Sequence, residues 1–198
     1  MSQMSDQTKE AIDQINGLSR RSFLKAASGL AVVATVGTGL LGAVHAFASM
    51  PEGIKVMSAS EYQVMNRLMQ VHLASEGTGL IHASDIPVMQ TLDAALLATM
   101  EPHILEGLKG GIAYFNNGPK TDYNKTFVEL SDKQAAAFCD TWADSDEVSH
   151  RALAMGLKKL VSLSYWANPP TWEPLGYDGP VTEKWNLVPL GNAPLPKY

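Results

Sequence analysis

The sequence predicts an all-α protein, and two features support this fold class. Apolar residues recur every three or four positions between residues 58 and 168, which is the spacing of one face of an α-helix. No segment competes with this pattern as a β-strand. The roughly 150 residues that follow the N-terminal segment are enough for one domain with a hydrophobic core. We therefore expect about five amphipathic helices in one compact domain over residues 49–168.

The first three helices are expected in the first half of this domain. Ser58 is suited to cap the first helix, because Glu61 stands at the third position as in a capping box. The second helix should carry Pro87 in its first turn, where a proline is tolerated. The third should begin at Pro102 and end at the Asn-Asn-Gly-Pro sequence of residues 116–119.

Two further helices complete the expected domain. Ser131 is the expected N-cap of the fourth helix, with Gln134 in the reciprocal position. The fifth helix should start near Asp146, because acidic residues in a first turn are favoured by the helix dipole. It should end at Asn168, since two prolines follow directly.

The C-terminal segment, residues 169–198, has a different character. Seven prolines lie between Asn168 and the C-terminus, and this density prevents a long helix or a central strand. Trp172, Tyr177 and Trp185 accompany them, and large apolar side chains are unfavourable in a fully solvated linker. The segment is expected to be an extended arm that lies on a surface, either that of its own domain or that of a partner.

The N-terminal segment, residues 1–48, resembles an export signal. The sequence SRRSFLK at residues 19–25 precedes 23 nearly uncharged residues that end in Ala46-Phe47-Ala48, a small-x-small pattern suited to signal peptidase. This arrangement favours a removable signal, with cleavage after Ala48 or alternatively after Ala46, over an anchor that stays in the membrane. The residues expected to be read by the twin-arginine translocase are Arg20, Arg21, Phe23 and Leu24.

Charge and cysteine content restrict the possible partners. Without residues 1–48 the chain has 11 Lys and Arg against 17 Asp and Glu, a formal net charge of −6, which argues against nucleic acid as a ligand. Cys139 is the only cysteine, so no disulfide can form within the chain. Its thiol either packs as a small buried apolar group or forms a disulfide with another subunit.

Motifs for cofactor binding or catalysis are not recognisable in the sequence. Gly77-Thr78-Gly79 lacks the third glycine of a dinucleotide-binding loop, and there is no haem, iron–sulfur or zinc-protease signature. His72 is interpreted as a hydrogen-bonded core residue, whereas His82 and His103 would be metal ligands only if the fold brought them together. We predict no catalytic, cofactor-binding or metal-binding residue in this chain.

Three short sequences carry a resemblance to a known family. They are YWANP at residues 165–169, WEPLGYDGP at residues 172–180, and the helix opening FVELSDKQ at residues 127–134. Together with the leader, they resemble the small subunits of membrane-bound sugar and polyol dehydrogenases, the gluconate 2-dehydrogenase subunit 3 family. The resemblance implies a flavoprotein catalytic subunit that carries FAD, a cytochrome c subunit as a further partner, and a non-catalytic, chaperone-like role for the small subunit.

The sequence therefore predicts an accessory subunit that supports the folding and twin-arginine export of a dehydrogenase. Its complex would lie in the periplasm, at the face of the inner membrane. The alternative is a stand-alone exported helical enzyme or binding protein, with metal dependence if scattered histidines and aspartates meet. The residues predicted to contact the partner subunit are Cys139, Trp166, Trp172, Tyr177 and Trp185.

Overall fold

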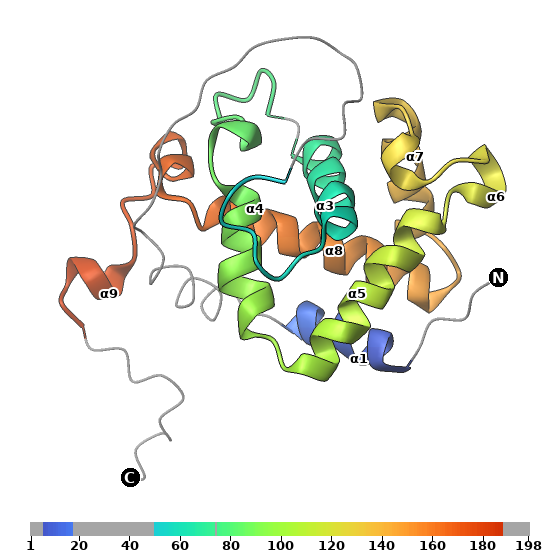
Figure 1. Ribbon diagram of the computed structural model, residues 1–198. Coiled ribbons are helices and arrows are strands. Elements are labelled where there is room, and N and C mark those ends of the chain that lie inside the picture. The colour runs from blue at the N-terminus through green and yellow to red at the C-terminus, as the bar shows by residue number, and fades with distance from the viewer. Residues whose placement is uncertain (1–5, 18–49, 74, 188–198) are drawn as a thin grey trace.

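The computed structural model describes residues 6–17, 50–73 and 75–187, and over these residues the chain is helical without strands (Figure 1). The all-α fold class is thus confirmed. The long helix α8, Val148–Trp166, crosses behind α3, Ala59–His72, and α5, Pro102–Asn117. Helix α7, Asp132–Ala143, packs against α8 and also contacts α3.

Four of the five expected helices begin and end close to the predicted positions. Ser58 and Ser131 both form capping boxes, with Glu61 and Gln134 as the reciprocal residues. Each box satisfies backbone N–H groups that a helix start would otherwise leave without an acceptor. Helix α8 ends at Trp166, shortly before the two prolines.

The second expected helix is broken into short pieces. A 3₁₀ turn, η2 (Ala83–Asp85), precedes α4 (Val88–Thr91), which continues as the π-helical turn η3 (Leu92–Leu96) and the 3₁₀ turn η4 (Leu97–Thr99). The π turn contains Asp93, whose carboxylate is buried. Its oxygens accept hydrogen bonds from the backbone N–H groups of Lys55, at 2.7 Å, and Met57, at 2.8 Å. Asp93 thereby holds the segment before α3 against the π turn.

The core is dominated by a cluster of aromatic rings between α5 and α7. Phe115 packs edge-on against Phe127 and Trp142, with ring centroids 4.8 and 5.3 Å apart. Phe138 completes the cluster, and the turn at Gly118 lies directly against it. Such pairs stabilise a core beyond the area that they bury. The short elements η5, Phe127–Glu129, and α6, Lys120–Tyr123, connect α5 to α7.

A helix that the sequence did not predict lies in the N-terminal segment. Helix α1, Asp6–Gly17, packs against α5 and α8 (Figure 1). Thr8 and Ile12 are buried there, at 2% and 1% exposure. Part of the predicted leader is therefore packed against the helical domain. The predicted export and cleavage residues, Arg20, Arg21, Phe23, Leu24, Ala46 and Ala48, lie outside the described residues.

Candidate functional site

The inner part of the C-terminal arm is fixed to the end of α8. The side-chain amide of Asn168 donates a hydrogen bond to the carbonyl oxygen of Ser164 at 2.7 Å. The 3₁₀ turn η6, Pro169–Thr171, follows, and the buried Thr171 hydroxyl donates to the Asn168 carbonyl at 2.8 Å. Because both side chains are buried and bonded, the arm leaves the helical domain in a fixed direction.

Trp172 is the last anchor of this inner part. Its indole N–H donates a hydrogen bond to the carbonyl oxygen of Trp166 at 2.8 Å. After the turn η7, Glu173–Leu175, Gly176 adopts a left-handed conformation, with φ of 66°, and reverses the chain. The reversal brings Tyr177 edge-on to Trp172, with ring centroids 5.2 Å apart. The Trp-x-x-x-Gly-Tyr sequence therefore forms a compact aromatic turn.

The outer part of the arm exposes apolar side chains to solvent. It includes the short helix α9, Val181–Lys184, which stands apart from the helical domain at the left of Figure 1. Lys184 pairs with Asp178 and closes this part of the arm. The exposed apolar residues of the arm, which we call the outer-arm surface, are Leu175, Tyr177, Val181, Trp185 and Leu187, with exposures of 57%, 40%, 48%, 66% and 50%.

The outer-arm surface has the properties of a site for association. Large apolar groups that stay in water are unfavourable, and several of them close together along one segment usually mark a surface that contacts another macromolecule. Trp185 is the most exposed of them, and tryptophan is enriched among the residues that dominate binding energies. The arrangement can bury apolar area against a partner.

Four of the five predicted interface residues lie at the end of α8 or along the arm. Trp166 is the last residue of α8 and accepts the hydrogen bond from Trp172 of the inner arm, whereas Tyr177 and Trp185 belong to the outer-arm surface. The sequence did not indicate the other members of the outer-arm surface, Leu175, Val181 and Leu187, because isolated aliphatic residues in a proline-rich segment carry no periodic signal. Cys139 stands apart from the other four, since Figure 1 places its helix α7 and the arm helix α9 at opposite sides of the domain.

Cys139 is buried at 2% exposure in the α7–α8 interface. Burial raises the pKa of its thiol to about 11, because desolvation disfavours the thiolate. An open pocket of about 110 Å³ lies beside it, lined by Val71, His72, Ala136, Cys139, Asp140 and Lys158. In this conformation the thiol is a small apolar core group, and a disulfide with another subunit would require its neighbours to move.

The histidines are placed at separate positions. His72 donates to or accepts from the Ser162 hydroxyl at 3.0 Å, but it is exposed rather than in the core. His82 contacts Ser84 at the start of η2, whereas His103 pairs with Glu10 of α1. The fold gives the two histidines different neighbours. Within residues 6–17, 50–73 and 75–187, no three acidic, histidine or cysteine side chains form a potential metal site.

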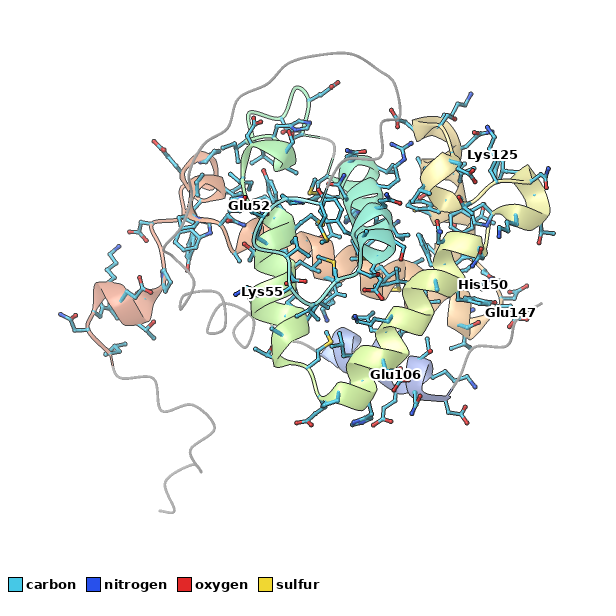
Figure 2. All side chains as sticks on the ribbon, viewed as in Figure 1. Glu52, Lys55, Glu106, Lys125, Glu147 and His150 are labelled. Atoms are coloured by element: carbon cyan, nitrogen blue, oxygen red, sulfur yellow. The ribbon has the colours of Figure 1, made fainter. Side chains whose placement is uncertain are left out.

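His150 is the histidine most involved in packing. Its ring stacks on Trp142, with centroids 4.1 Å apart, and it lies near Glu147 at the start of α8 (Figure 2). Tyr114 and Ser145 hydrogen-bond to its two ring nitrogens at 3.2 and 3.1 Å. Burial lowers the pKa of His150, and the negative charge of Glu147 only partly opposes this effect. The neutral imidazole is therefore the form that suits this packing.

None of the helices in the described part of the chain is long and apolar enough to span a bilayer. The helical domain and its exposed apolar arm together form a small all-α protein. Residues 59–179 match the family model for gluconate 2-dehydrogenase subunit 3. This match covers more than half of the chain, from the start of α3 to the aromatic turn of the arm.

The chain belongs to the gluconate 2-dehydrogenase subunit 3 family. It is accordingly a dehydrogenase subunit, and its family assembles into hetero-oligomeric dehydrogenase complexes. No curated protein and no solved structure shows significant similarity to the chain. The sequences at residues 127–134 and 165–169 that carried the resemblance lie within the matched region, which also covers residues 172–179 of the third one.

Proposed function

We propose that this chain is a non-catalytic accessory subunit that supports the folding and twin-arginine export of an FAD-dependent sugar or alcohol dehydrogenase. The catalytic flavoprotein subunit would travel with it, and a cytochrome c subunit is a further expected partner. The complex would act in the periplasm at the inner-membrane face. FAD would be bound by the partner, so the residues of this chain serve assembly rather than turnover.

The outer-arm surface is the observation that carries this proposal. Its apolar side chains are half or more exposed at Leu175, Trp185 and Leu187, and the arm holds five of the eight exposed large apolar side chains in the described part of the chain. A catalytic partner that covers this surface would remove the cost of its exposure. Because Asn168, Thr171 and Trp172 fix the inner arm, the point from which the outer-arm surface extends is set, and association loses less conformational entropy.

The contacts of the inner arm decide which arm variants are informative. Deleting the chain from Thr171 would remove a fully buried side chain, so the helical domain itself would be damaged. Truncation after Pro180 removes α9 and Trp185 while it retains the aromatic turn. The sharpest variant is Trp185→Ala combined with Leu187→Ala, since both side chains are exposed and neither belongs to the domain core.

The experiment is affinity purification of the tagged chain from cells that produce the complete complex. Truncated hot-spot side chains cost about 2 kcal/mol or more each, so the double variant should weaken partner binding by at least about a hundredfold. Flavin released by acid from the purified material, together with dye-linked dehydrogenase activity, measures the bound partner. Glu183→Ala, at an exposed position of the adjacent helix α9, should leave both readouts unchanged. Turnover by the purified chain alone, or full flavin recovery with the double variant, would refute the proposal.

Export is tested separately. Replacing Arg20 and Arg21 by lysine keeps the charge but removes the planar guanidinium groups, so the precursor should remain in the cytoplasm. N-terminal sequencing of the periplasmic form should begin at Ser49, or at Phe47 if cleavage follows Ala46. Normal export of the double lysine variant contradicts the route, and Met1 on periplasmic material contradicts the cleavage.

A further inference from the structure

Helix α5 carries a face of glycines that fits one particular neighbour. Gly107, Gly110 and Gly111 stand at positions i, i+3 and i+4, so they lie on one side of the helix. Each glycine inside a helix costs about 1 kcal/mol relative to alanine. Three of them within five residues would weaken α5 unless a closely packed neighbour compensates.

Helix α1 is that neighbour, and its backbone touches α5 directly. A Cβ atom on Gly107 would lie 2.1 Å from the carbonyl oxygen of Gln7, which is a backbone atom and cannot rotate away. A Cβ atom on Gly111 would lie 3.0 Å from the Thr8 methyl and 2.8 Å from Leu153 of α8. Only glycine at position 107 lets the α1 backbone approach this closely, whereas a side chain at position 111 would require Leu153 or Thr8 to shift.

Helix α1 also packs two buried side chains against the helical domain. Thr8 and Ile12 stand four residues apart, on one face of the helix, and both are buried. The other described side chains of α1 are exposed, including Lys9, which pairs with Asp6, and Glu10, which pairs with His103 across to α5. Exposed ion pairs of this kind contribute little to stability. Among the described side chains of α1, Thr8 and Ile12 are therefore the ones that bury apolar surface against the domain.

We propose that the groove formed by the glycine face of α5 and by Leu153 of α8 is a docking site for the N-terminal segment of the leader. This inference rests on the proposed assignment of residues 1–48 as a signal, but the docking itself does not. Helix α1 binds this groove in the folded precursor and holds the leader against the helical domain. The occupant of the groove is the chain's own segment Asp6–Gly17.

Docking of this kind distinguishes a folded from an unfolded precursor. The groove exists only when α5 and α8 are packed together, because Gly111 and Leu153 come from different helices. An unfolded domain offers no such site, and α1 by itself is too short to be a stable helix in water. Arg20 follows Gly17 after only Leu18 and Ser19, so docking restrains the chain immediately before the arginine pair. The leader is thus held by the folded domain until the translocase displaces it.

Hydrogen exchange of the full-length precursor tests the docking. The N–H groups of residues 10–17 should be protected, because they follow the first turn of α1. Ile12→Asp places a charge in a buried site and should lower this protection by about tenfold or more, without changing protection in α3 or α7. Gly107→Leu should have the same effect from the opposite side of the contact.

The matched control is Ala113→Leu, which adds the same side chain at an exposed position of α5. It should leave the protection of α1 intact. Exchange of residues 10–17 at the rate of an unstructured peptide in the unmodified precursor would overturn the docking. Unchanged protection in both Ile12→Asp and Gly107→Leu would overturn it as well.

The consequence for export is measured in cells with the same Ile12→Asp variant, whose change lies outside the helical domain. If docking holds the leader, its release should speed conversion of precursor to mature protein several-fold in a pulse–chase experiment. An unchanged conversion rate, with protection lost in vitro, would overturn the restraining role while leaving the docking in place. If neither the Ile12→Asp variant nor the unmodified precursor is processed at all, the assignment of residues 1–48 as a signal is wrong, and the docking of α1 is unaffected.

Discussion

Replacing Asp93 tests a buried carboxylate that accepts several backbone hydrogen bonds at once. Its carboxylate is 1% exposed and accepts hydrogen bonds from three successive backbone N–H groups, those of Lys55, Val56 and Met57, at 2.7 to 3.1 Å. Hydrogen bonds to a charged acceptor contribute roughly 1.5–3 kcal/mol each. Lys55 is exposed, so water can replace the carboxylate there, whereas Met57 is buried and would keep an unsatisfied N–H group.

These values predict that Asp93→Ala lowers the free energy of unfolding by about 3–5 kcal/mol. Asp93→Asn retains one carbonyl oxygen but sets an amide donor against the N–H groups, so it should cost about half as much. Urea unfolding of the full chain, followed by tryptophan fluorescence, measures both values. Asp140→Ala, at an exposed position of α7, should change stability by less than about 0.5 kcal/mol. A loss below about 1 kcal/mol for Asp93→Ala, or equal losses for Asp93→Ala and Asp140→Ala, would refute the role assigned to Asp93.

Three further outcomes follow from the described contacts. The pKa of His150 in the folded chain lies below the unfolded value of about 6.5. Its packing therefore adds to the free energy of unfolding fully above about pH 6.5, and this contribution is lost as the pH falls through the lower folded pKa. His150→Gln should reduce the loss of stability at acid pH, measured by urea unfolding across pH. The thiol of Cys139, with a pKa of about 11 in the folded chain, should react with an aromatic disulfide reagent at pH 8 about a hundredfold more slowly than in urea, and equal rates would contradict its burial. Gly118→Ala would place a Cβ atom 2.3 Å from Trp142, so calorimetry should show a loss of about 1–3 kcal/mol, and an unchanged melting temperature would contradict the close packing.

The helix starts were predictable because their determinants are local. Ser58 with Glu61, and Ser131 with Gln134, form boxes within four residues, so the sequence alone specifies both caps. The end of α8 was equally accessible, since the prolines after Asn168 cannot continue a helix.

The break in the second expected helix was not predictable in the same way. Its π turn coincides with the contacts of Asp93 to N–H groups 36–38 residues earlier in the chain, and no periodicity reports such a pairing. Helix α1 was missed because residues 6–17 resemble an ordinary polar leader region. A signal for α1 was present in α5, because three glycines so close together, Gly107, Gly110 and Gly111, are unusual within one helix and indicate a closely packed neighbour.

Part of the candidate site was predictable from composition alone. Trp172, Tyr177 and Trp185 in a proline-rich segment indicated an arm against a surface, but composition could not divide it into an anchored and an exposed part. That division depends on the hydrogen bonds of Asn168 and Thr171 to the backbone at the end of α8. The burial of Cys139 also depends on tertiary packing, since α7 places it against α8.

The contacts of Asp93 lie close to the predicted cleavage position. Only the segment from Ser49 to Ile54 separates that position from Lys55, the first residue that hydrogen-bonds to the Asp93 carboxylate. Cleavage after Ala48 would therefore leave a new amino terminus near a backbone segment that Asp93 holds just before the Ser58 cap of α3. The strength of this contact would then limit how far disorder at the new terminus could spread into α3.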